Sequence, residues 1–179
     1  MKNLFVLFFA LLTFAVQSNA QAPKVVGGEE MYPTKNIIEN AVNSNDHTTL
    51  VAAVKAAGLV ETLQGEGPFT VFAPTNAAFE QLPEGTVPTL LKPENKAKLT
   101  TVLTYHVVPG KLDAMAIKKA LEKKDKLTLK TVAGEKLTVM MDNGQVKVMD
   151  KNGGVATVTI ADVYQSNGVI HVVDKVLLP

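Results

Sequence analysis

One stretch of the sequence decides the fold: Gly67-Pro68-Phe69-Thr70-Val71-Phe72-Ala73-Pro74-Thr75-Asn76-Ala77-Ala78-Phe79. It begins with a Gly-Pro pair, which ends any helix before it. Residues 69–73 are mostly aromatic and β-branched, and this short apolar run predicts a buried strand that ends at Pro74. Thr75 or Asn76 can then cap a new helix. We expect this strand-to-helix turn to bring together three aromatic side chains as a core nucleus, namely Phe69, Phe72 and Phe79.

The rest of the chain changes its hydrophobic period once. Before residue 126, apolar residues recur mostly at helical spacing, and Asp113 can cap a helix that runs through Leu121. An exception is residues 105–108, which we expect to form a strand ending at a Pro-Gly turn. After residue 126 the period is two, and three turns separate the strands, at Asn143-Gly144, Asn152-Gly153-Gly154 and Asn167-Gly168. Helices followed by a strand meander predict an α+β fold.

Three segments resemble the signatures of fasciclin domains: residues 67–79, residues 105–112 (Tyr-His-Val-Val-Pro-Gly-Lys-Leu) and residues 167–179 (Asn-Gly-Val-Ile-His-Val-Val-Asp-Lys-Val-Leu-Leu-Pro). They stand in the family's order and cover most of the chain. The resemblance implies a β-wedge of two sheets with helices packed against it. It also assigns a structural part to seven residues, Phe69, Phe72, Thr75, Asn76, Phe79, Asn167 and Gly168.

The first 20 residues have the pattern of a signal peptide. Lys2 precedes an apolar run over residues 4–16, and Ser18-Asn19-Ala20 offers small residues for cleavage after Ala20. We therefore expect a secreted or periplasmic protein that starts at Gln21 and inserts in no membrane after cleavage. Residues 21–33 contain two glycines and little periodicity, which predicts a flexible leader, and residues 34–179 then form a single fasciclin domain.

Composition narrows the classes of partner. There is no cysteine for a disulfide, and every one of the 18 basic residues is lysine. Without Lys2 the basic and acidic residues balance, whereas a nucleic-acid binder shows a basic excess and arginine forks. We expect no nucleic-acid partner and no polybasic membrane anchor, and the balance leaves protein and polysaccharide partners open.

No pattern for a metal, a cofactor or a nucleophile stands out. Asp142 and Asp150 lie in hairpin turns that lack the further carboxylates of a calcium loop. The three histidines are scattered, although zinc needs three or four converging ligands. We expect His47 to be exposed at a helix start, and His106 to bond across to the Thr75-Asn76 turn. We expect His171 to be a structural histidine as well.

Candidate binding residues come only from the resemblance. The Tyr-His pair of the family, here Tyr105 and His106, has been tied to adhesion. Integrin-binding peptides of animal fasciclin domains precede the last Asn-Gly-Val segment, where this chain matches one pair of residues as Asp162-Val163.

These observations favour a secreted, non-enzymatic adhesion or interaction module that needs no cofactor and meets protein or polysaccharide at the cell surface or in the matrix. Two other functions stay open. One is an extracellular enzyme acting on a polysaccharide or related polymer, with carboxylates and a histidine as acid and base. The other is a carrier for a small apolar ligand between the helices and the wedge.

Overall fold

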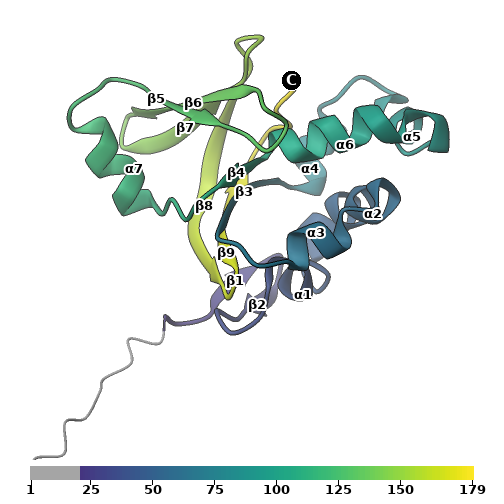
Figure 1. Ribbon diagram of the computed structural model, residues 1–179, viewed down its shortest axis with the longest axis horizontal. Helices are drawn as coiled ribbons and strands as arrows, with labels where there is room; N and C mark the ends of the chain where they lie inside the picture. Colours follow the sequence, from purple (N-terminus) through teal and green to yellow (C-terminus); the bar gives the residue numbers. More distant parts are fainter. Residues whose placement is uncertain (1–20) are drawn as a thin grey trace, which may run out of the picture.

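The computed structural model describes residues 21–179, and the predicted signal peptide lies outside these residues. Figure 1 shows a strand-rich half and a helix-rich half that meet along β3 and β9. The strands are β1 (Lys24–Val26), β2 (Glu29–Met31), β3 (Phe69–Pro74), β4 (Val107–Pro109), β5 (Leu127–Lys130), β6 (Lys136–Asp142), β7 (Gln145–Met149), β8 (Val155–Gln165) and β9 (Gly168–Val173). The helices are α1 (Ile37–Ala41), α2 (Thr48–Ala57), α3 (Val60–Gln64), α4 (Asn76–Glu80), α5 (Thr86–Leu90), α6 (Lys96–Tyr105) and α7 (Ala114–Leu121), with 3-10 turns η1 (Asn45–His47) and η2 (Pro93–Asn95).

The long strand β8 joins two sheets into a wedge. Seven strands follow the order β4-β3-β9-β8-β7-β6-β5, and only the β3–β9 pair is parallel. Residues 155–157 of β8 pair with β7, whereas the register with β9 begins at Val158 and shifts twice before Val163. Such irregularities bend and twist a strand. The predicted α+β wedge with packed helices is therefore confirmed.

The far edges of the two sheets also approach each other. The N–H of Val132, just after β5, donates to the carbonyl oxygen of Val107 in β4 at 2.8 Å. The strands consequently form an almost closed layer around an apolar interior. Its buried side chains are Phe72, Tyr105, Val108, Ile117, Leu129, Leu137, Val139, Val148, Ala156, Val158, Val173 and Leu177.

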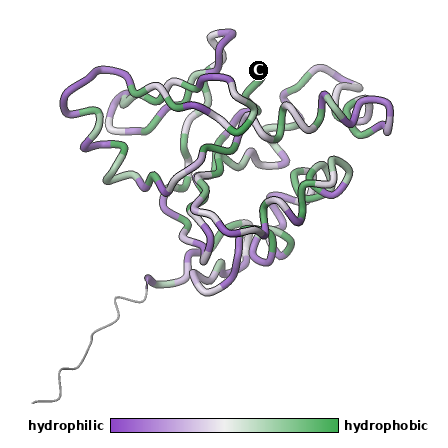
Figure 2. The backbone as a smooth tube through the Cα atoms, viewed as in Figure 1, coloured by the Kyte–Doolittle hydropathy of each residue, from purple (hydrophilic) through white to green (hydrophobic). Residues whose placement is uncertain are grey.

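A second apolar core lies between the helices and the other face of β3 and β9. Strand side chains alternate between faces, so Val71 and Ala73 join the helix-side core and Phe72 joins the strand interior. The expected cluster of three phenylalanines is thus wrong: Phe69 and Phe79 pack on the helix side, and the sheet separates them from Phe72. Figure 2 shows hydrophilic residues gathered at the outer turns of the strands.

Most of the predicted turns and caps are present. The three turns that contain Asn and Gly connect β6 to β7, β7 to β8 and β8 to β9. Thr75 caps α4 by accepting from the N–H of Ala78, and Asp113 caps α7 by accepting from that of Ala116. These local signals specify backbone hydrogen bonds that do not depend on distant parts of the chain.

Two predicted segments differ from the structure. Tyr105 ends α6 and His106 is its C-cap, so the strand expected from residue 105 begins only at Val107. Within the expected leader, β1 and β2 pair as a hairpin that buries Val26 and Met31. These two apolar side chains are too far apart in sequence to produce a periodic pattern. Among residues 21–179, none of the helices has the length and apolarity that crossing a membrane requires.

Gly168 is expected to tolerate no side chain. A Cβ atom there would lie 2.2 Å from the carbonyl oxygen of Phe69, where β9 begins its pairing with β3. We predict that Gly168→Ala lowers the free energy of unfolding by about 1–3 kcal/mol, because the backbone must shift. Gly144→Asn is the control, since that turn has open space and asparagine accepts a positive φ. Urea denaturation checks both variants, and equal midpoints for them would contradict the prediction.

Candidate functional site

Tyr105 and His106, the pair expected to bind a partner, lie inside the molecule. Tyr105 has no exposed surface, and its hydroxyl donates to the carbonyl oxygen of Lys136 at 2.9 Å and accepts from the N–H of Lys151 at 3.0 Å. Burial raises the pKa of this phenol. The side chain therefore ties the end of α6 to β6 and to the turn after β7.

His106 uses both ring nitrogens on the backbone. Nδ1 donates to the carbonyl oxygen of Val102 at 2.8 Å, and Nε2 accepts from the N–H of Leu177 at 2.9 Å. A carbonyl oxygen can only accept, so these partners require the neutral tautomer with its proton on Nδ1. The expected bond to the Thr75-Asn76 turn is wrong, and the ring instead holds the C-terminal segment.

Asp162 and Val163 serve the junction between β8 and α7. Asp162 adopts a φ of 56°, and its Oδ1 accepts from the N–H of Ala114 at 2.6 Å. Val163 has no exposed surface. Tyr164 donates to Oδ2 of Asp113 at 3.3 Å, and its pKa is raised to about 12 by burial together with the charges of Asp162 and Asp113. The carboxylates that come together here accept from N–H groups in the first turn of α7.

His171 is the structural histidine that we expected. Its Nε2 donates to the carbonyl oxygen of Leu112 at 2.7 Å, and its Nδ1 accepts from the N–H of Asp162 at 3.3 Å. The ring stacks on Phe72 with centroids 5.7 Å apart, and burial lowers its pKa. It therefore links β9 both to the bulge of β8 and to the segment before α7.

The two signature asparagines connect helices to the ends of the parallel strands, because Asn167 precedes β9 and Asn76 follows β3. The side chain of Asn167 accepts from the N–H of Ile37 and donates to the carbonyl oxygens of Leu63 and Gly65. Asn76 donates to the carbonyl oxygen of Asn45 at 2.9 Å and also bonds the start of α2. Within residues 21–179, no three His, Asp or Glu side chains converge as a metal site would require.

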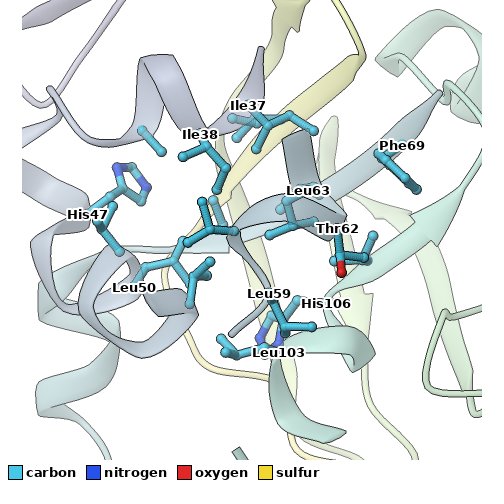
Figure 3. Close-up of a pocket in the computed structure, with 18 of the residues that line it drawn as sticks. Ile37, Ile38, His47, Leu50, Leu59, Thr62, Leu63, Phe69, Leu103 and His106 are labelled. Atoms are coloured by element: carbon cyan, nitrogen blue, oxygen red, sulfur yellow. The ribbon is translucent and has the colours of Figure 1, made fainter. Parts of the chain in front are cut away.

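An apolar cavity of about 70 Å³ lies between α1, α2, α3 and α6 and the helix-side face of β3 (Figure 3). Its lining includes exposed side chains, Lys55, Thr62 and Val132, so it reaches the surface there. The buried part is formed by Ile37, Ile38, Leu50, Val54, Leu63, Val71, Ala73 and Ile170.

His47 stands in this lining, contrary to the expectation of an exposed ring. It is 1% exposed, and its Nδ1 lies 2.9 Å from Oγ of Ser44, which is also buried. Figure 3 shows the ring and Thr62 on opposite sides of the cavity. The sequence could have predicted this burial, because the spacing of His47, Leu50 and Val54 places the histidine on the apolar face of a helix.

We predict that His106→Ala destabilises the fold. The change leaves the N–H of Leu177 without an acceptor and opens a void, and each effect costs on the order of 1–3 kcal/mol. Urea denaturation at pH 7.5 measures the loss, and a midpoint equal to that of the wild type would contradict the structural role.

His106 also gives the fold a pH dependence. Burial lowers its pKa to about 4, against 6.5 in an unfolded chain. Between these two pH values the unfolded state binds more protons than the folded state. The contribution of neutral His106 to the free energy of unfolding is therefore complete above pH 6.5, and about 3 kcal/mol of it is lost as the pH falls toward 4. His106→Gln should reduce the dependence of the free energy of unfolding on pH in this range. A smaller dependence should remain, because burial also lowers the pKa values of His47 and His171.

Comparison with known proteins agrees with this architecture. The chain is 47% identical to protein sll1483 of Synechocystis, over 98% of this chain and 91% of that protein. It is 37% identical to the transforming growth factor-beta-induced protein ig-h3 of Sus scrofa, over 82% of this chain and 20% of that protein. It is 33% identical to the cell surface glycolipoprotein MPB83 of Mycobacterium bovis, over 90% of this chain and 67% of that protein.

Among solved structures, a FAS1 domain pair from the insect cell adhesion molecule Fasciclin I superposes with a TM-score of 0.74. The match covers 83% of this chain and 52% of the pair at 17% identity, and so concerns the fold alone. The family model of the fasciclin domain matches residues 45–179. With this match and the identity to its relatives, the chain belongs to the fasciclin domain family.

Proposed function

We propose that this protein is a secreted or periplasmic, non-enzymatic interaction module that meets protein or polysaccharide at the cell surface or in the matrix. The observation that carries this proposal is the relationship over 90% of the chain to a protein named for the cell surface. The signal-peptide pattern of residues 1–20 supports the same location.

Two histidines and two aspartates that could serve as acid or base are engaged in the fold. His106 and His171 bond the backbone through both ring nitrogens. Asp113 and Asp162 accept from the first turn of α7. Using any of these groups for proton transfer would break a hydrogen bond that joins two elements. This supports recognition without chemistry over the polysaccharide-degrading alternative.

One experiment tests location and attachment together. We expect the exported product to begin at Gln21, and beads coated with residues 21–179 to bind the producing cells several-fold better than albumin-coated beads. Soluble protein should compete for this attachment, because the interaction is specific. Attachment that soluble protein does not reduce, or an exported chain that retains Met1, would contradict the proposal.

A second function is favoured by the apolar cavity: carriage of a small apolar molecule between the helices and the sheet. Ligand sites are concave, mostly apolar and largely formed before binding. This cavity combines an apolar interior with a path to the surface beside Thr62 and Val132. The two functions are compatible, since the cavity uses the core and adhesion uses the surface.

Filling the cavity should block such binding. Val51 lines it and is only half-buried, so Val51→Phe adds volume without displacing a tightly packed side chain. We predict that this variant binds xenon, a small apolar probe suited to a cavity of about 70 Å³, at least about tenfold more weakly than the wild type, a loss of about 1.4 kcal/mol. Val155→Phe is the control, because Val155 is also half-buried but does not line the cavity. Unchanged ¹²⁹Xe chemical-shift titrations for Val51→Phe would show that the probe binds elsewhere.

A further inference from the structure

The chain contains three Asn-Gly pairs, and each stands at a turn between consecutive strands: Asn143-Gly144, Asn152-Gly153 and Asn167-Gly168. Asparagine before glycine readily loses its side-chain amide, because a residue without Cβ leaves its own backbone nitrogen unhindered. That nitrogen must reach Cγ of the asparagine, so both the side chain and the turn have to move. The three turns differ in how far they permit this movement.

Asn167 is held most firmly of the three. Its side chain accepts from the N–H of Ile37 at 3.1 Å and donates to the carbonyl oxygens of Leu63 and Gly65 at 2.8 and 3.0 Å. Gly168 is buried, and the backbone that surrounds it leaves no room for a Cβ atom. Neither the amide nor the glycine nitrogen can move without disturbing the contact between the helices and the parallel strands.

Asn152 is held in part. Its Nδ2 donates to the carbonyl oxygen of Leu178 at 3.1 Å, and its N–H donates to Oδ1 of Asp150 at 2.9 Å. The N–H of Gly153 donates to the carbonyl oxygen of Asp150 at 3.2 Å, so the nitrogen that would attack is engaged. The turn is exposed, but both reacting groups must first give up a hydrogen bond.

Asn143 has none of these restraints. Asn143 and Gly144 are exposed, and within residues 21–179 neither the side chain of Asn143 nor the N–H of Gly144 makes a hydrogen bond. A Cβ atom on Gly144 would meet nothing within 4 Å, so the tip of this turn lies in open space. The pairing of Asp142 with Gln145 closes the turn. Opening this last pair leaves the apolar interior in place.

We propose that Asn143 is a site of spontaneous deamidation in the folded protein, with Gly144 as the internal nucleophile. Hydroxide takes the proton of the Gly144 N–H, and the nitrogen attacks Cγ of Asn143 to close a succinimide ring. The bond from Cγ to the amide nitrogen breaks, and this nitrogen leaves as ammonia after it takes a proton from water. Water then opens the ring at either carbonyl and gives aspartate or isoaspartate. The reaction consumes water, releases ammonia and needs no oxidant.

The products change the β6–β7 hairpin in two ways. Either acid adds a negative charge beside Asp142, whose carboxylate pairs with Lys147. Isoaspartate also carries the main chain through its side-chain carbon, so the turn becomes longer by one methylene. Turn length fixes the register of a hairpin, and these two strands supply the buried Val139 and Val148 to the strand interior. We therefore expect the isoaspartate form to be less stable than the parent protein.

Peptide mapping tests the assignment. Cleavage at lysine leaves Asn143 alone in residues 137–147 and puts the other two pairs together in residues 152–175, where fragmentation separates them. After incubation of residues 21–179 at mildly alkaline pH, we expect Asn143 to convert at least about tenfold faster than Asn167. Breaking one or two hydrogen bonds at Asn167 adds the ~1.4 kcal/mol of barrier that a factor of ten requires. Asn152 should convert at an intermediate rate.

The denatured chain is the control for the effect of the fold. In guanidinium chloride the three pairs should convert at similar rates, because only the local sequence then matters. Similar rates in the native protein, or a faster conversion of Asn152 or Asn167, would overturn the assignment. So would a native Asn143 that stays intact under conditions in which the denatured chain reacts.

Asn143→Gly separates this modification from other changes during incubation. Glycine adopts the same positive φ and carries no amide. Urea denaturation of the incubated wild type should show a midpoint that falls as its isoaspartate content rises, whereas incubated Asn143→Gly should keep its initial midpoint. An isoaspartate-containing sample with an unchanged midpoint would overturn the expected effect on the hairpin.

Discussion

The parallel pairing of β3 with β9 is the constraint on which the remaining structure depends. It joins residues 69–74 to residues 168–173, and both strands are almost completely buried. Parallel strands with both faces covered are typically apolar along their whole length, as these are apart from Thr70 and His171. One face closes the strand interior and the other receives the helices, so both cores form against the same two strands. The close contact between Gly168 and Phe69 sets their register at one end.

Several polar side chains inside the domain form hydrogen bonds that join separate secondary-structure elements. Tyr105, His106, His171 and Asn167 each join parts of the chain that are distant in sequence, and most of their partners are backbone atoms. Backbone partners depend on position and not on the identity of the neighbouring side chain. A structural role in the fold is therefore sufficient to account for these four side chains. Within residues 21–179, His47 differs from this group because its Nε2 has no hydrogen-bond partner.

Local signals in the sequence were sufficient for much of the fold. The strand over residues 69–73, the caps Thr75 and Asp113 and the three Asn-Gly turns all depend on short-range chemistry, and the structure contains each of them. The family resemblance supplied the wedge, which no periodicity reveals. The predictions that were wrong concern features that depend on tertiary contacts. His106 binds Leu177 because the C-terminal segment folds back beside α6, and the hairpin at residues 24–31 forms because two isolated side chains find the helix-side core. The cavity could not be predicted at all, since it depends on how closely four helices approach one strand.

The distance along the chain between β3 and β9 has a consequence for how the protein is made. These strands are about a hundred residues apart, and non-local pairings of this kind form slowly because a long loop must close first. Neither core can be completed while the last strand is still within the ribosome. The newly made chain therefore stays without its native core until synthesis is almost finished. A polypeptide of this topology offers a translocation machinery an unfolded substrate for longer than a domain built from neighbouring contacts would.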